Sequence, residues 1–196
     1  MRLPFTFTGP LVTERLVVRA MTSADVDDVH AYQSREDVCR YLPFEPRTRE
    51  EVVTKVATVS TALTLADETD FWQLAVELRS EPGRVIGDVF FALRSVANAR
   101  GEIGWTLHPG FAGRGYMTEA GRAILEVAFG AIGLHRVTAV LDPRNHASAA
   151  LCRRLGMRRE AHFVEDLMFK GEWGDTEIYA ILDREFSAAH GRPLPR

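Results

Sequence analysis

The chain has 196 residues, a formal net charge of −3 and a hydrophobic content of 46%, which is ordinary for one globular domain with a substantial core. A mildly acidic chain argues against non-specific nucleic-acid binding, which needs a basic surface. No apolar run approaches the roughly 20 residues of a membrane helix, and the N-terminus lacks a signal-peptide pattern. Two distant cysteines without a histidine at metal-ligand spacing lead us to expect a reduced, cytoplasmic protein without a structural metal.

The first half of the chain is predicted to contain two helices and several strands. Residues 16–21 form a strand, and Thr22-Ser23-Ala24-Asp25 caps a helix that reaches about residue 34. Prolines and aromatic residues make 34–49 an irregular loop, and a helix from about 49 to 63 carries valines at helical spacing. Further strands are predicted at residues 72–78, 85–93 and 102–107.

The second half contains a strand, a glycine-rich turn and a helix in succession. The turn is the run Gly-Phe-Ala-Gly-Arg-Gly-Tyr-Met-Thr-Glu-Ala at 110–120, and the helix extends from 117 to 132. A strand at 136–141 precedes a helix at 149–155, for which Asn145 is an N-cap and Gly156 a stop. The last predicted strands lie at residues 162–170 and 176–182.

Gly113 and Gly115 expose backbone N–H groups where a helix begins, and these donors and the helix dipole favour a phosphate-bearing ligand. A P-loop is excluded because no lysine lies near the turn. A dinucleotide fingerprint is poorly matched, since Thr118 occupies the third glycine position. A coenzyme A pyrophosphate site and a plain β–α turn remain.

Other short motifs accompany this turn in a fixed order. They are Thr13-Glu14-Arg15-Leu16, Val85-Ile86-Gly87-Asp88, Gly101-Glu102-Ile103-Gly104-Trp105, Asn145-x-x-Ser148, Leu155-Gly156-Met157 and Phe169-Lys170-Gly171-Glu172-Trp173-Gly174-Asp175. Together with the turn they resemble the GNAT N-acetyltransferase superfamily and, within it, the ribosomal-protein-alanine N-acetyltransferase (RimJ/RimL-type) branch. The resemblance covers nearly the whole chain.

The resemblance implies a single α/β domain at residues 1–186, followed by a flexible tail at 187–196. Hairpins and one β–α–β crossover independently indicate a mixed sheet flanked by helices. The expected sheet is twisted and mostly antiparallel, with about six to seven strands and one parallel pair that splays apart.

The implied reaction is direct acetyl transfer from acetyl-CoA to a primary amine, without an acyl-enzyme or a metal. The acceptor is a protein N-terminal α-amine or a small-molecule amine, and the enzyme is a monomer or a homodimer. A non-catalytic acyl-CoA-binding regulatory module is the alternative, and Met117, which is bulky for a close-approach position, favours it unless its side chain points into the core. A nucleotide-binding oxidoreductase is a third hypothesis.

The resemblance also assigns residues to the cofactor. Backbone groups of the strand before the turn contact the pantetheine arm, those of the turn hold the pyrophosphate, and Asn145 is a polar contact to the arm unless it only caps its helix. The strand residues are Trp105, Thr106 and Leu107, and the turn residues are Gly113, Arg114, Gly115, Tyr116, Met117 and Thr118.

Three residues are candidates for catalysis. Ser148 is the implied general acid, although a first-turn serine also bonds its own backbone. Cys152 stands where many family members have a tyrosine, and a buried, inert thiol is the competing interpretation. Glu102, with Asp88 behind it, is a candidate base or simply a solvated strand residue. Leu167 occupies the place of a strand glutamate in some relatives, which leaves the base open.

Acceptor contacts are expected from aromatic residues and from the loop at 34–49. The aromatic candidates are Trp72, Phe90 and Trp173. Acidic residues at 67, 68 and 70 attract a cationic acceptor or belong to a solvated loop.

Overall fold

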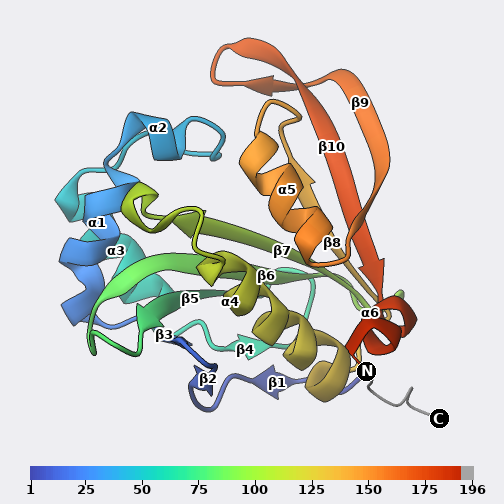
Figure 1. The fold of residues 1–196 in the computed structure, drawn as a ribbon. Coiled ribbons are helices and arrows are strands. Elements are labelled where there is room, and N and C mark those ends of the chain that lie inside the picture. The colour runs from blue at the N-terminus through green and yellow to red at the C-terminus, as the bar shows by residue number, and fades with distance from the viewer. Residues whose placement is uncertain (191–196) are drawn as a thin grey trace.

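A computed structural model describes residues 1–190 of the chain as one mixed sheet with helices on both faces (Figure 1). The large sheet has the strand order β2-β3-β5-β6-β7-β8-β10-β9, and two short strands, β1 and β4, pair separately. The strands are β1 Phe5–Thr6, β2 Leu11–Val12, β3 Leu16–Ala20, β4 Thr64–Leu65, β5 Phe71–Leu78, β6 Val85–Ser95, β7 Arg100–Leu107, β8 Arg136–Leu141, β9 Arg158–Phe169 and β10 Glu172–Leu182.

All recorded strand pairs are antiparallel except β7 with β8, which is parallel. The helices are α1 Val26–Gln33, α2 Glu36–Cys39, α3 Arg49–Val59, α4 Tyr116–Glu126, α5 His146–Arg154 and α6 Asp183–His190. The predicted fold class, a mostly antiparallel sheet with one parallel pair, is confirmed.

Alternating residues of the central strands separate two hydrophobic cores. Leu74 and Val76 of β5 pack in the core that contains the α4 residues Ala120 and Ile124. Ala75, between them, packs in the second core with residues of α1 and α3. Because neighbouring side chains of a strand point to opposite faces, α4 covers one face of the sheet and α1 with α3 the other.

Several element boundaries differ from the sequence-based predictions. The helix predicted to reach residue 63 ends at Val59, and the Ser60 and Thr61 hydroxyls donate to carbonyls of its last turn, a local bond that competes with helix continuation. The loop predicted at 34–49 contains the one-turn helix α2. The helix after the glycine turn continues from α4 through a π-helical turn at Val127–Ile132.

The predicted tail begins too early. Helix α6 includes residues 187–190, and Ser187 is buried with its hydroxyl donating to Asp183 at 3.2 Å. Helical structure therefore continues beyond the predicted domain end at 186. The remaining predicted tail, 191–196, lies outside the described residues.

Candidate active site

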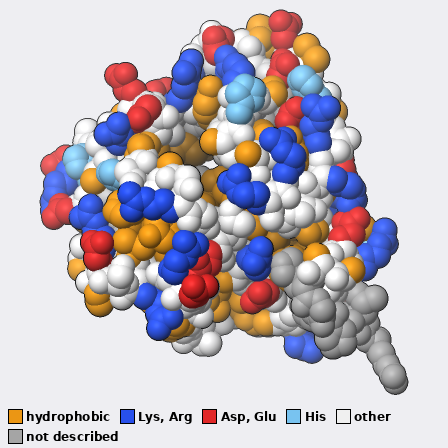
Figure 2. Space-filling model, viewed as in Figure 1, with side chains coloured by type: hydrophobic (Ala, Val, Ile, Leu, Met, Phe, Trp, Pro, Cys, Tyr) orange, Lys and Arg blue, Asp and Glu red, His pale blue; other side chains and the backbone are white. Residues whose placement is uncertain are grey.

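A cavity of about 1170 Å³ lies on the α1/α3 face of the sheet and continues between β7 and β8 to α5. Figure 2 shows the molecule hollowed between the α2 segment and α5, with Lys and Arg side chains gathered around the hollow on this face. The cavity is bounded by residues 41–47, the side of α3, residues of β5, β6, β7 and β8, the start of α5 and the tip of the β9–β10 hairpin.

The opening between β7 and β8 results from incomplete pairing. The two strands pair at only three positions, the last of which is Glu102 with Thr138. Beyond it, residues 103–106 of β7 and 139–141 of β8 line opposite sides of the cavity. Backbone N–H and C=O groups on this edge of β7 therefore have no partner in β8, as the resemblance implied.

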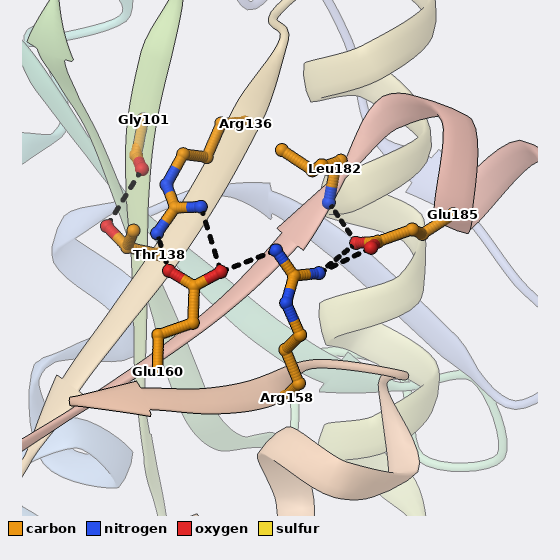
Figure 3. Close-up of polar contacts among 7 residues, drawn as sticks. All are labelled: Gly101, Arg136, Thr138, Arg158, Glu160, Leu182 and Glu185. Atoms are coloured by element: carbon orange, nitrogen blue, oxygen red, sulfur yellow. Dashed lines mark hydrogen bonds and ion pairs between the residues drawn. The ribbon is translucent and has the colours of Figure 1, made fainter.

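Side-chain bonds hold the closed end of the same strand pair. Thr138 Oγ1 donates to the Gly101 carbonyl at 3.2 Å. Next to it runs a chain of ion pairs that links β8, β9 and α6 (Figure 3). Its members, in order, are Arg136, Glu160, Arg158 and Glu185. The strands are thus fixed at one end and open at the other.

The glycine turn delivers the chain to the N-terminus of α4 in left-handed backbone conformations. Gly113 has φ +75° and Gly115, the N-cap of α4, has φ +78°, values at which glycine is free of strain. Gly115 has no side chain with which to cap the helix, so N–H groups of the first turn are left without an intrahelical or capping partner. This geometry is suited to an anion.

An unpredicted brace fixes this turn to the first long strand. Glu119 accepts hydrogen bonds from Thr13 Oγ1 at 2.6 Å, from the Arg15 backbone at 2.8 Å and from Arg15 Nε at 2.7 Å. The Arg15 guanidinium also donates to the Arg114 carbonyl at 2.9 Å. Burial acts to raise the pKa of Glu119, but these hydrogen bonds outweigh it and hold the pKa below its usual value. The motif Thr13-Glu14-Arg15 was the available sequence signal.

The Met117 side chain points into the core and does not obstruct the glycine turn. It is 5% exposed and packs in the core beneath α4, near Gly87 of β6. The feature that favoured a non-catalytic module is therefore a core contact.

The start of α5 brings three predicted residues together. Asn145 caps the helix, its Oδ1 accepting from the Ser148 backbone N–H at 3.1 Å. Ser148 Oγ accepts a hydrogen bond from Trp105 Nε1 at 3.1 Å. Both Asn145 and Ser148 line the cavity opposite the open edge of β7. Since its recorded bond uses a lone pair, the Ser148 hydroxyl retains its proton for another acceptor.

Cys152 lies one turn further along α5 and does not line the cavity. It is fully buried in the core, and burial raises the pKa of its thiol to about 12. These properties match the buried, inert interpretation more closely than that of a proton donor.

Glu102 and Asp88 both line the cavity but have different surroundings. The Glu102 carboxylate accepts from Arg94 Nε at 3.0 Å and from Arg94 Nη2 at 3.2 Å, and it is partly exposed. Asp88 is fully buried and accepts from Tyr32 Oη at 2.7 Å, Gln33 Nε2 at 3.1 Å and Gln73 Nε2.

Asp175 is a cavity carboxylate that the sequence reasoning missed. It follows Gly174, the β10 residue that faces Leu167 across the hairpin. The Glu165 backbone N–H and His162 Nε2, each 2.9 Å away, hold its pKa below the usual value. A carboxylate therefore approaches the site from the strand next to the one on which a glutamate was sought.

The predicted acceptor contacts are partly brought together. Residues 41–47 of the predicted loop and Phe90 line the cavity. Trp72 is fully buried in the core, and Trp173 is 60% exposed and does not line the cavity. Asp67 and Asp70 accept hydrogen bonds from backbone N–H groups of their own turn, which supports the solvated-loop interpretation.

Lys170, at the hairpin tip, contacts the segment that lines one side of the cavity. Its Nζ donates to the carbonyls of Cys39 and Phe44, both at 2.9 Å, and approaches Glu45 at 3.4 Å. It therefore ties β9 to the segment after α2.

Residues 15–158 match the model of the Acetyltransferase (GNAT) domain family. The uncharacterized N-acetyltransferase YnaD of Bacillus subtilis (strain 168) is 32% identical over 177 residues, which are 90% of this chain and 99% of that protein. The crystal structure of a GNAT-family acetyltransferase from Bacillus anthracis aligns with a TM-score of 0.80 and 31% identity, covering 90% of this chain and 99% of that one. The ribosomal protein uS5-alanine N-acetyltransferase of Escherichia coli (strain K12) is 29% identical over 85 residues, 43% of this chain and 44% of that protein.

The fold and the matched residues define an acetyltransferase. The chain belongs to the GNAT family, and it is a distant relative of a ribosomal-protein alanine N-acetyltransferase. The predicted family resemblance is thereby confirmed. Within residues 1–190, no helix is long and apolar enough to cross a membrane.

Proposed function

We propose that the chain transfers an acetyl group from acetyl-CoA directly to a primary amine, without an acyl-enzyme. The observation that carries this proposal is the parting of β7 and β8 after Glu102, which opens a passage between the Ser148 hydroxyl and a large cavity on the opposite face of the sheet. Such a passage suits a reaction in which donor and acceptor approach from different sides.

The chain's residues fit coenzyme A at two places. The unpaired edge of β7 offers amide partners from Trp105, Thr106 and Leu107 to a pantetheine arm. The uncapped first turn of α4, residues 113–118, offers N–H donors to a pyrophosphate. Bound acetyl-CoA supplies an acetyl thioester, which is already activated toward amine attack.

Ser148 is the proposed proton donor to the departing thiolate. The Trp105 indole N–H fixes its oxygen at 3.1 Å and leaves the hydroxyl proton available. Cys152 is the less suitable donor, because its thiol is fully buried and does not line the cavity. Asn145 positions Ser148 through the cap and adds a polar contact beside the arm.

Glu102 is the proposed exit for the proton of the attacking amine. An α-amino group titrates near about 7.7–8.0, so a fraction is neutral without assistance. Glu102 then receives the proton directly or through water, with Asp88 deeper in the same cavity. A Glu102→Gln variant should alter the pH–rate profile, and a profile identical to that of the wild type would remove Glu102 from this role.

Two acceptor types fit a primary-amine reaction: a protein N-terminal α-amine and a small-molecule amine. The name of the uS5-alanine relative supports the former. We also propose a cytoplasmic location, which is supported by the two free, buried cysteines.

Thermal unfolding with acetyl-CoA, NAD or ATP tests the donor assignment. A ligand that binds only the folded state raises the unfolding midpoint, and we expect a rise with acetyl-CoA alone. Release of free thiol from acetyl-CoA on addition of amines then tests the reaction. No midpoint shift with acetyl-CoA would overturn the proposal.

A further inference from the structure

Two cationic side chains line the cavity without a hydrogen-bond or ion-pair partner among the described residues. Arg47 and Lys55 both line it, from the segment before α3 and from α3 itself. Within residues 1–190, neither side chain makes a hydrogen bond or an ion pair. Both lie near the ring of Phe44, with the Arg47 guanidinium carbon 4.1 Å and Lys55 Nζ 5.8 Å from its centroid.

The other cationic groups at this cavity are engaged. Arg94, which lines the cavity, forms a two-point contact with Glu102, and Lys170, at the adjoining hairpin tip, donates to the carbonyls of Cys39, the last residue of α2, and Phe44. The absence of partners thus distinguishes Arg47 and Lys55, and it is not general to cations at this site.

The environment of Lys55 makes an unpaired charge unfavourable. The residue is partly buried beside the core positions Val52 and Val59, one helical turn away on either side. Burial lowers the pKa of Lys55, whereas the nearby Asp88 carboxylate acts in the opposite direction. A half-desolvated ammonium gains most from an anion that enters the cavity.

Lysine is also rare in this chain. Positions 55 and 170 hold its only lysines among 24 basic residues, and Lys55 lines the cavity. Arginine supplies all the other basic residues, so Lys55 is not an instance of a common surface residue.

We propose that Arg47 and Lys55 bind a carboxylate of the acceptor, so that the molecule acetylated carries both a primary amine and a carboxylate. This inference rests on the proposed function and specifies its substrate class. Both cations lie within about 6 Å of the same Phe44 ring, whose cation–π contacts hold them near one another and within reach of one anionic group.

Carboxylate is favoured over phosphate by the remaining charges. Glu45, Glu50 and Glu51 line the same part of the cavity. These carboxylates repel a dianion more strongly than a monoanion. The same acidic surroundings favour the ammonium form of an entering amine, so the site fits a molecule with both charges.

Matched acceptor pairs provide the test. The rate constant kcat/KM is measured for alanine and alaninamide, for the C-terminally amidated dipeptides Ala-Asp-amide and Ala-Asn-amide, and for phosphoethanolamine and ethanolamine. We expect the wild type to favour the carboxylate member of at least one of the first two pairs by roughly 10- to 100-fold, the value of a hydrogen-bonded charge. Equal rates within both pairs, or a preference confined to the phosphate ester, would overturn the inference.

Variants locate the preference. Lys55→Met and Arg47→Met should each raise KM for the acceptor that has a carboxylate, whereas KM for the matched acceptor without one should change little. Lys55→Arg should retain the preference. Arg49→Met is the matched control, because Arg49 begins the same helix but pairs with Asp27 outside the cavity. A preference that survives both methionine variants would contradict the assignment.

The unfolding midpoint with acetyl-CoA distinguishes failure of the proposed function from failure of the acceptor inference. If acetyl-CoA does not raise the unfolding midpoint of the wild type, the proposed function fails. If it does, and amines are acetylated without regard to a carboxylate, only the acceptor inference fails.

Discussion

The end of the cavity near α5 is formed mainly by backbone groups, and the end near α3 is formed mainly by side chains. Near α5, the boundary consists of an unpaired backbone edge and a helix cap that involves neighbours three residues apart, and the glycine turn follows that edge along the chain. Near α3, it consists of side chains from separate segments, and the Lys170 contact with Cys39 joins residues 131 positions apart.

This difference has a chemical counterpart. Backbone N–H groups and helix termini suit a ligand part that is common to many enzymes, such as a pyrophosphate. Side chains from independent segments vary without disturbing the backbone frame, so they suit the part that distinguishes one acceptor from another. The backbone end and the side-chain end should therefore respond differently to substitution.

Replacing Ser148 with alanine should have the largest effect on turnover. Loss of a positioned proton donor lowers kcat by about 100-fold or more, whereas acetyl-CoA affinity should not change, because the backbone frame is intact. Stopped-time thiol release and calorimetry measure the two quantities. A wild-type kcat in the Ser148→Ala variant would contradict the role of Ser148 as proton donor and would assign that role to solvent.

A Gly115→Val substitution tests the backbone end directly. At φ +78° a β-branched residue is strained by about 1–3 kcal/mol, and its methyl groups stand in front of the first-turn N–H donors. We expect acetyl-CoA affinity to fall roughly 10- to 100-fold by calorimetry. Gly171→Val is the matched control, because Gly171 has a similar left-handed φ of +86° and open space at its Cβ position but lies at the hairpin tip, outside the turn. Unchanged affinity in the Gly115→Val variant would contradict the anion site.

Lys170→Met tests the side-chain end. It removes the donor that ties the hairpin tip to residues 39–45, and we expect KM for the acceptor to rise about 3- to 10-fold, as for loss of one or two charged hydrogen bonds at a partly exposed site. Acetyl-CoA affinity should be unaffected. An equal change in both constants would show that the two ends are not independent.

Glu119→Gln should have the smallest effect. The folded-state pKa of Glu119 is lowered, so its stabilisation is complete above the unfolded pKa of a glutamate and is lost as pH falls through the folded value. The variant should lose about 1 kcal/mol of unfolding free energy at neutral pH, and the loss should shrink in acid. Denaturant titrations at pH 7 and pH 3 measure it. A pH-independent loss would exclude the carboxylate charge as its cause.

The α5 end of the site was largely predictable because its signals are local. Left-handed glycines, an asparagine N-cap and a helix-stop glycine each leave a mark at a fixed spacing. Asn145 and Gly156 are found in the predicted roles, the latter at φ +81°. Gly87 and Gly101 were noted in motifs, but only packing explains them, since a Cβ at Gly87 would lie 2.3 Å from the Thr106 carbonyl oxygen.

The α3 end was not predictable in the same way. Nothing local distinguishes Arg47 and Lys55 from solvated charges, and Trp72, an expected acceptor contact, is a core residue between Phe5, Phe7 and Phe91. Asp175 was missed because it lies on the strand paired with the one that was searched. In each case the role depends on which segments meet.

From the sequence alone follow the family, the order of the elements and the location of the glycine turn, because backbone conformation and hydrophobic alternation are properties of adjacent residues. The tertiary structure decided that Met117 packs in the core, that Ser148 receives the Trp105 indole bond and that Glu119 braces the turn. It also decided which charges at the cavity have partners, because burial and pairing arise only when distant segments come into contact.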